Sequence, residues 1–169
     1  MTSSKVLVVF FSRTGTTKHV GLEIAKALAA DVAELTEGKS RRGLLGYLRS
    51  GFEASRGKTT TLRDSYQAAP GYGLVVVGTP VWVASVSSPV RTFLRRHAGQ
   101  LPRLAFFATM GGRGSETAFS QMAVEAKRSP IASVAFTDRE VRSAKHLEKL
   151  TGFVSELRKA SASTSVTTA

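Results

Sequence analysis

The chain has 169 residues, 42% of them hydrophobic, and its 24 Lys and Arg against 12 Asp and Glu give a formal net charge of +12. This length favours a single domain with a substantial core. Because there is no cysteine, disulfides, iron–sulfur clusters, thiolate zinc sites and a cysteine nucleophile are all excluded.

No segment is typical of secretion or of a membrane span. The amino-terminal apolar run is too short for a signal peptide and lacks a small-residue cleavage site, and no segment approaches the roughly 18 apolar residues of a span. We therefore expect a cytoplasmic protein. The sequence pI of about 10.8 predicts attraction to acidic proteins, nucleic acid or anionic lipid without distinguishing among them.

The first apolar run, at 5–11, is unbroken and rich in β-branched and aromatic residues, which predicts a strand buried on both faces. Beyond it, Val20, Ile24 and Leu28 recur at helical spacing. The hydroxyl-rich loop at 12–17 should then lie between the carboxyl end of a strand and the amino end of a helix. Unpaired N–H groups and the helix dipole attract anions there.

The composition of this loop narrows the ligand. It matches neither the G-x-x-x-x-G-K-[ST] loop of nucleoside triphosphates nor the G-x-G-x-x-G loop of dinucleotides. One glycine among the hydroxyls of Ser12, Thr14, Thr16 and Thr17 suits a single terminal monophosphate, as in flavin mononucleotide (FMN). The alternative is a Ser/Thr cluster that only caps the helix.

The next segment combines a weak strand with a strongly basic stretch. Residues 31–35 predict a short strand that suits the edge of a sheet. Residues 39–63 contain seven Lys and Arg against one acid, a local charge of +6, and a leucine stripe within 43–55 predicts an amphipathic helix. Packing on the sheet explains the stripe, and Tyr47 and Phe52 are the only residues here that we consider near a ligand.

A second buried strand is predicted at 74–78, followed by a loop at 79–89. Pro89 indicates the first turn of a helix, whose apolar positions are Val90, Phe93 and Leu94. Trp82, the only tryptophan, lies in the loop, either as core filling or as an aromatic platform for a ligand.

The last third of the chain repeats the pattern. A strand at 103–109 precedes a flexible loop at 110–115 and a helix from about Glu116 to Ala126, with Phe119 and Met122 on its apolar face. A strand at 131–136 precedes a helix with apolar positions Leu147, Leu150, Val154 and Leu157. We expect one domain over 1–160 and a disordered tail over 161–169, which has nothing to bury.

Strand and helix thus alternate five times with short connections, which predicts a doubly wound α/β fold with a parallel sheet and helices on both faces. Ligands bind such sheets outside the carboxyl ends of the strands. The three loops of unusual composition, at 12–17, 79–86 and 109–115, all follow strands. Because all three loops lie at the carboxyl ends of strands, we expect them to form one shared binding site.

Three motifs give the chain its resemblance to the flavodoxin family: S-R-T-G-T-T after the first strand, V-V-V-G-T-P-V-W at the third, and A-T-M-G-G-R-G-S at the fourth. The resemblance covers nearly the whole chain and implies strand order 2-1-3-4-5 and FMN as cofactor. The segment G-L-L-G-Y-L-R-S-G-F-E-A is also similar to one in small bacterial flavodoxin-like proteins.

The resemblance also implies the cofactor-binding residues. The phosphate would be held by Ser12, Arg13, Thr14, Gly15, Thr16 and Thr17; one face of the isoalloxazine ring would be lined by Thr79, Pro80, Val81, Trp82, Val83 and Ala84; and the other face by Thr109, Met110, Gly111, Gly112, Arg113 and Gly114. Two features depart from flavodoxins, whose third loop is acidic: this loop contains Arg113, and it lacks a tyrosine to stack on the ring.

The function implied is redox chemistry through non-covalent FMN, with no residue needed as acid or base. The protein is then either a reductase that takes hydride from NAD(P)H to a small acceptor such as a quinone, or a one-electron carrier that docks an acidic redox partner. Arg113 favours two-electron chemistry because a positive charge stabilises reduced, anionic flavin. The segment 39–63, together with Arg91, Arg95, Arg96 and Arg103, should form the surface that docks the partner.

Two other function classes have less support. A hydrolase could use Ser12, Ser85, Ser87 or Ser88 with His19, His97 or His146, but no serine lies in a G-x-S-x-G elbow and the histidines share no ligand spacing. A nucleic-acid-binding module is supported by charge alone.

Overall fold

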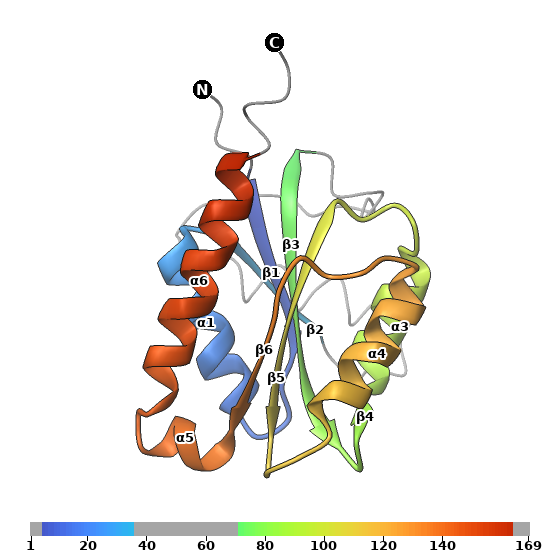
Figure 1. Cartoon of the computed structure of the whole chain (residues 1–169). Helices are drawn as coiled ribbons and strands as arrows, with labels where there is room; N and C mark the ends of the chain where they lie inside the picture. The colour runs from blue at the N-terminus through green and yellow to red at the C-terminus, as the bar shows by residue number, and fades with distance from the viewer. Residues whose placement is uncertain (1–4, 36–70, 164–169) are drawn as a thin grey trace.

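The computed structural model describes residues 5–35 and 71–163, which form a parallel sheet between two layers of helices (Figure 1). In chain order the elements are β1 (Lys5–Phe11), α1 (Thr16–Leu28), β2 (Asp31–Leu35), β3 (Tyr72–Trp82), β4 (Ser85–Val86), α3 (Ser88–Arg96), β5 (Arg103–Met110), α4 (Ser115–Ala126), β6 (Ser133–Thr137), α5 (Asp138–Arg142) and α6 (His146–Ser163).

The strand order is β2-β1-β3-β5-β6, and every pairing along this path is parallel. Counting only these five strands along the chain gives the order 2-1-3-4-5, so the predicted fold is confirmed. β2 lies at an edge of the sheet, as its weak pattern predicted. The two-residue strand β4 is an addition that pairs antiparallel with the end of β3.

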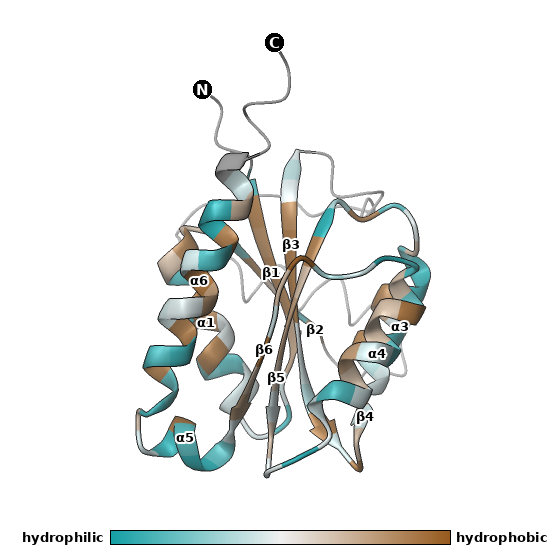
Figure 2. Cartoon of the chain, in the orientation of Figure 1, coloured by the Kyte–Doolittle hydropathy of each residue, from teal (hydrophilic) through white to brown (hydrophobic). Residues whose placement is uncertain are grey.

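Each central strand is buried on both faces because its alternate side chains enter two separate cores. In β1, Leu7 and Val9 pack toward α3 and α4, whereas Val8 and Phe10 pack toward α1 and α6. The same alternation continues in β3 and β5. Figure 2 shows the consequence: the strands are apolar, while the helices present hydrophilic residues outward.

The region predicted as a loop over 79–89 is largely ordered structure, and that prediction was wrong. β3 continues through Trp82, and a two-residue turn returns the chain as β4 before α3 begins. Backbone pairing of Val81 with Val86 and of Trp82 with Ser85 holds this hairpin. The sequence signal was obscured because Pro80 and the serines are typical of loops.

Three smaller predictions also needed correction. The last strand is Ser133–Thr137 rather than 131–136, and the short helix α5 that follows it was not expected. In α6, Leu150, Val154 and Leu157 are buried as predicted, but Leu147 is 47% exposed and does not belong to the apolar face.

Several expectations concern residues that the structure does not describe. The basic segment 39–63 and its predicted helix at 43–55 lie outside the described residues, as does most of the predicted tail. α6 continues through Ser163, three positions beyond the expected domain boundary at 160. Among the described residues, no helix combines the length and the apolar character that a membrane crossing requires.

Candidate functional site

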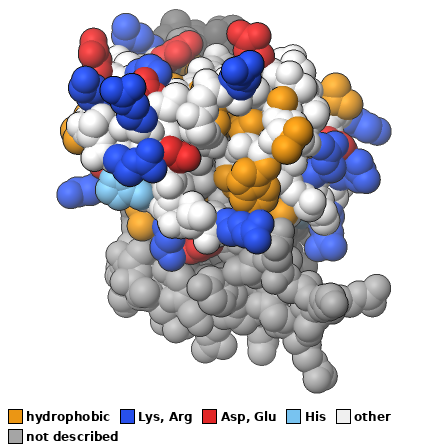
Figure 3. Space-filling view, turned by 90° about the horizontal axis from the view of Figure 1, so that it is seen from below, with side chains coloured by type: hydrophobic (Ala, Val, Ile, Leu, Met, Phe, Trp, Pro, Cys, Tyr) orange, Lys and Arg blue, Asp and Glu red, His pale blue; other side chains and the backbone are white. Residues whose placement is uncertain are grey.

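The three predicted loops meet at the carboxyl edge of the sheet, where they surround a shallow hollow. Figure 3 looks onto this edge and shows apolar side chains at its centre with Lys and Arg around them. The hollow is lined by Arg13, Thr14, Thr16, Thr17, Pro80, Val81, Trp82, Thr109, Met110, Gly111 and Asp138. Residues up to 125 positions apart thus contribute to one surface, as Arg13 and Asp138 illustrate.

The loop at 12–17 forms the polar end of the hollow. The hydroxyl of Ser12 accepts hydrogen bonds from the backbone N–H groups of Gly15, at 3.2 Å, and Lys18, at 3.1 Å. Ser12 thus supports the start of α1 with its hydroxyl, whereas the N-cap position itself is Gly15, which has no side chain to cap the helix. The hydroxyls of Thr14 and Thr16 form no hydrogen bond with any described residue, and both residues line the hollow.

The first turn of α1 adds backbone donors to this end. The first intrahelical hydrogen bond runs from the His19 N–H to the Gly15 carbonyl, so the N–H groups of Thr16 and Thr17 come before it, and within the described chain they donate to nothing. The first turn contains no acidic residue that would neutralise the positive end of the helix dipole. Two free N–H groups and two free hydroxyls therefore converge where an anion is favoured.

A buried hydrogen bond fixes the loop at 12–17 to the third loop. The hydroxyl oxygens of Thr17 and Thr109 are 2.7 Å apart, and both residues are almost fully buried. Since Thr17 is in α1 and Thr109 near the end of β5, this contact sets the distance between the two loops across the floor of the hollow.

Trp82 forms the aromatic end of the hollow. Its side chain is 41% exposed, and it packs edge-on against Phe11 with ring centroids 6.1 Å apart. The Arg13 guanidinium carbon lies 5.7 Å from the centre of the Trp82 ring. The exposure of Trp82 argues against its interpretation as core filling, and the Arg13 guanidinium over the ring forms a cation–π contact. The platform for a ligand stays a prediction.

The turn after Trp82 has an unusual backbone. Val83 and Ala84 have φ angles of +49° and +55°, the positive values of a type I′ hairpin turn. Such turns favour Asn and Gly, and a β-branched residue is strained in this conformation. The opposing loop passes so close that a Cβ added to Gly114, whose own φ is +101°, would lie 2.7 Å from the Cα of Ala84.

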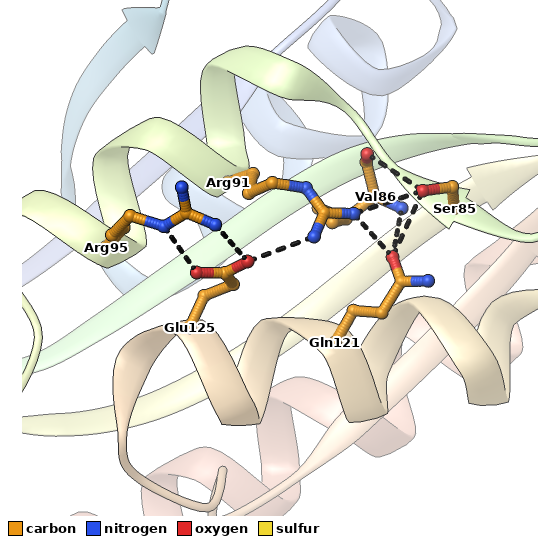
Figure 4. Close-up of polar contacts among 6 residues, drawn as sticks. All are labelled: Ser85, Val86, Arg91, Arg95, Gln121 and Glu125. Carbon is orange, nitrogen blue, oxygen red and sulfur yellow. Dashed lines mark hydrogen bonds and ion pairs between the residues drawn. The ribbon is translucent and has the colours of Figure 1, made fainter.

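A polar network on α3 and α4 holds this hairpin from behind (Figure 4). The side-chain oxygen of Gln121 accepts hydrogen bonds from the Val86 N–H at 3.1 Å, the Ser85 hydroxyl at 3.1 Å and the Arg91 guanidinium at 2.9 Å. Arg91 also pairs with Glu125, at 3.0 Å. The hairpin is thereby connected to both helices on that face.

Ten of the eighteen predicted site residues line the hollow: Arg13, Thr14, Thr16, Thr17, Pro80, Val81, Trp82, Thr109, Met110 and Gly111. The others lie beside or behind it. Ser12 holds the loop at 12–17 by accepting from two backbone N–H groups, Thr79 is fully buried with its hydroxyl accepting from the Ser87 N–H, and Gly114 packs against the hairpin turn. Gly15, Val83, Ala84, Gly112 and Arg113 are not among the lining residues.

Sequence reasoning missed Asp138, which also lines the hollow. It is the first residue of α5, and a capping box holds it there: Thr137 accepts from the Glu140 N–H, and Glu140 accepts from the Thr137 N–H. A T-x-x-E pattern immediately after a predicted strand was the available signal. It would have located a helix start at the carboxyl edge.

Of the four arginines that the sequence analysis assigned to the docking surface, Arg91, Arg95, Arg96 and Arg103, the structure pairs two with one acid and places a third at the other edge of the sheet. Arg91 and Arg95 both pair with Glu125, and Arg95 holds its carboxylate with two hydrogen bonds of 2.9 Å. These contacts lower the pKa of Glu125, chiefly through the hydrogen bond from Arg95. Arg103 begins β5 at the opposite edge of the sheet, where it donates to the Ala160 carbonyl.

The groups suggested for hydrolysis do not assemble. In the part of the chain that is described, Ser12, Ser85 and Ser87 bond to backbone N–H groups or to Gln121, Arg91 and Thr79, with no histidine among their partners. His19 and His146, by contrast, are brought together, with ring centroids 5.9 Å apart. Sequence spacing gave no indication of this pair.

Comparison with solved structures supports the fold. The chain is similar to a flavoprotein from Lactobacillus acidophilus NCFM solved in complex with FMN, at 22% identity and a TM-score of 0.57 over 83% of this chain and 97% of that one. It is also similar to the apo form of an NADH:FMN oxidoreductase, at 17% identity and a TM-score of 0.59 over 92% of this chain and 89% of that one. A third, a flavone reductase, matches at 11% identity and a TM-score of 0.57 over 96% of this chain and 63% of that one.

No protein-family profile matches the chain, and no curated protein does. At these identities the structural matches establish a flavodoxin-like fold and nothing finer.

Proposed function

We propose that this protein is an FMN-dependent redox flavoprotein whose cofactor binds in the hollow at the carboxyl edge. The observation that supports this most directly is the convergence of an anion-binding helix end and an exposed aromatic ring on one surface. FMN has a phosphate at one end and a planar ring at the other, joined by a polar chain. The lining of the hollow likewise has hydrogen-bond donors at one end, an aromatic ring at the other and polar groups between them. Several proteins of the same fold are flavoproteins, one of them solved with FMN.

The phosphate end is the loop at 12–17 with the first turn of α1. The free N–H groups of Thr16 and Thr17 and the free hydroxyls of Thr14 and Thr16 would donate hydrogen bonds to phosphate oxygens. Arg13 adds a positive charge beside them. A neutral ligand would leave these donors and this charge without a matching partner.

The remaining lining suits the rest of the cofactor. Trp82 offers an aromatic face to a planar ring, with the hydrophobic residues Pro80, Val81 and Met110 around it. The carboxylate of Asp138 would repel the phosphate but can accept hydrogen bonds from ribityl hydroxyls. The residues present therefore fit FMN in three chemically distinct parts.

When bound, FMN supplies hydride and electron transfer, while the protein positions it and sets the charge around it. Arg13 is the cation in the hollow, whereas Arg113 is exposed and outside its lining. A unit charge at about 10 Å contributes roughly 0.4 to 1.7 kcal/mol at an effective dielectric of 20 to 80. Arg13 would therefore favour the anionic reduced cofactor, which supports two-electron reduction of a small acceptor by NAD(P)H.

Titration of the full-length protein with FMN tests the proposal. Trp82 is the only tryptophan, so its emission reports directly on the hollow. We expect stoichiometric binding at micromolar concentrations with quenching of both flavin and Trp82 emission, and loss of flavin quenching in Trp82→Leu. An absence of binding at these concentrations would remove the proposal.

Steady-state oxidation of NADH and NADPH with a quinone then separates the two redox roles. Turnover that requires added or retained FMN supports the reductase. Binding of FMN without turnover would indicate the alternative, a one-electron carrier that docks an acidic partner protein. The pairing of Arg91 and Arg95 with Glu125 weakens that alternative, because it neutralises part of the expected docking surface.

A further inference from the structure

Two histidines and a glutamate meet between α1 and α6, outside the proposed FMN hollow. His19 and Glu23 are one turn apart on α1, and His146 is the first residue of α6. One nitrogen from each ring and a carboxylate oxygen all lie within 4.8 Å of one another. The helical spacing explains the first two residues, and only the packing of α6 beside α1 supplies the third.

Glu23 lies between the two rings. Its Oε1 is 3.6 Å from His19 Nε2, and its Oε2 is 2.6 Å from His146 Nε2. Zinc bonds to nitrogen and oxygen are about 2.0 to 2.2 Å long, so adjacent ligand atoms of a tetrahedral site are about 3.4 Å apart. The His19–Glu23 separation already suits such a site. The shorter His146–Glu23 contact is a hydrogen bond that a metal ion would replace.

His146 would be the rigid ligand of the three. Its ring is 2% exposed and packs edge-on against Phe136, with ring centroids 6.1 Å apart. Its Nδ1 is buried and has no hydrogen-bond partner in the described part of the chain, so the ring makes its polar contact through Nε2 alone. That nitrogen faces Glu23, with the His19 ring beside it.

The cluster is open to solvent on the side of His19 and Glu23. The side chains of His19 and Glu23 are 57% and 30% exposed, which gives an ion from solvent a path to the donor atoms. None of the three residues lines the hollow, so the cluster is a separate feature. It combines a fixed, buried ligand with two accessible ones.

We propose that His19, Glu23 and His146 bind a divalent transition-metal ion, with Zn²⁺ the best match, and leave one coordination position to water. Two imidazoles and one carboxylate suit zinc, whereas Mg²⁺ and Ca²⁺ prefer ligand sets made of oxygen alone. Three protein ligands with a fourth position open form the kind of zinc site that exchanges water for a small ligand. The ion would join α1 to α6 one helical turn from the loop at 12–17.

The affinity should be moderate. Metal-bound histidines usually donate their second ring N–H to an outer partner, and Nδ1 of His146 lacks one among the described residues. Because the three ligands are assembled only by the fold, the ion should bind the folded protein and stabilise it.

Calorimetric titration of the tag-free, full-length protein with ZnCl₂, combined with thermal unfolding, tests this site. Background binding should be low because the chain has three histidines and no cysteine. We expect one zinc per chain, a rise in Tm that a chelator reverses, and no comparable effect of Mg²⁺. The result should be the same with and without FMN, so failure here does not bear on the flavin proposal.

His19→Ala and Lys26→Ala form a matched pair, since both residues are exposed on α1 and only His19 belongs to the cluster. We expect His19→Ala to weaken zinc binding at least tenfold and to abolish the rise in Tm, while Lys26→Ala behaves as wild type. Glu23→Gln should also weaken zinc binding. Zinc binding that is absent in the wild type, or unchanged in both His19→Ala and Glu23→Gln, would overturn the proposal.

Discussion

The loop at 12–17 and the hairpin at 79–86 border the same hollow, but they are held in place by contacts of very different range. The loop is held largely by its own neighbours, since Ser12 accepts hydrogen bonds from N–H groups three and six positions away. The hairpin depends on Gln121, whose contacts with Ser85 and Val86 join residues 36 and 35 positions apart.

The two regions also differ in strain. The loop at 12–17 uses glycine, at Gly15, for its positive φ of 97°. In the hairpin, Val83 and Ala84 have positive φ angles although neither is glycine. A residue larger than glycine at Gly114 would collide with Ala84. Strained backbone of this kind persists only where the surroundings hold it, and it is concentrated at functional sites. The proposed phosphate end of the hollow is therefore held by local contacts, whereas the proposed ring end depends on support from the whole fold.

Gly114→Ala should reduce the stability more than any other substitution considered, because it disrupts the close packing of Gly114 against the hairpin turn. The new Cβ would lie 2.7 Å from the Cα of Ala84, and alanine is strained at a φ of +101°. We expect a loss of about 3 kcal/mol in unfolding free energy, measured by urea denaturation. Gly111→Ala is the control, since its Cβ would meet nothing within 4 Å and its backbone needs no glycine. Equal losses in the two variants would show that the close approach does not matter.

Removal of the free hydroxyls of Thr14 and Thr16 tests the opposite end. The double alanine variant should bind FMN about tenfold to a hundredfold more weakly, because hydrogen bonds to a charged phosphate contribute roughly 1.5 to 3 kcal/mol each and part of this is recovered by water. Riboflavin has no phosphate, so its affinity should change little. Flavin fluorescence titration measures both ligands, and a similar loss for each would contradict the assignment of the phosphate end.

The same contrast explains what the sequence could and could not predict. The buried strands, the five alternations and the loop at 12–17 produce local patterns, so the sequence alone could predict that Thr14 and Thr16 lie at the carboxyl edge, where both line the hollow. The ion pairs of Arg91 and Arg95 with Glu125 join α3 to α4 through residues that are 30 or more positions apart in the sequence. No local pattern reports such a contact, so the sequence analysis assigned these arginines to the docking surface without their acidic partner.

The hairpin and Asp138 were missed for different physical reasons. Val83 and Ala84 are poor turn residues, so the type I′ turn had no sequence signal, and tertiary contacts impose it. The helix that places Asp138 has a local signal, the capping box of Thr137 and Glu140, but it is only five residues long and has no apolar period. Of the three histidines, His146 is brought to His19 by packing alone.

Val83→Asn should stabilise the protein modestly and so measure the strain at the ring end. Val83 is fully exposed, so no packing is lost, and asparagine tolerates positive φ better than a β-branched residue. We expect a gain of about 1 kcal/mol in unfolding free energy. Val124→Asn is the control, because it removes another exposed valine from the ordinary helical backbone of α4 and should give no gain. A loss in Val83→Asn would mean that the turn is not strained.

The smallest effect should be a loss of stability at low pH, caused by protonation of Glu140. This residue belongs to α5, the short helix that positions Asp138 and is held by local contacts. Hydrogen bonds from Lys149 and from the Thr137 backbone lower the pKa of Glu140 to about 2, from its ordinary value of 4.5. Because the folded-state pKa is below that of the unfolded chain, the stabilisation from ionised Glu140 is complete above about pH 4.5 and is lost as the pH falls toward 2. The difference in stability between the wild type and Glu140→Gln should therefore shrink over that window in urea titrations. Lys149→Met should reduce the difference by removing the main cause of the shift, and a difference that does not change with pH would show that Glu140 is not held in its ionised form.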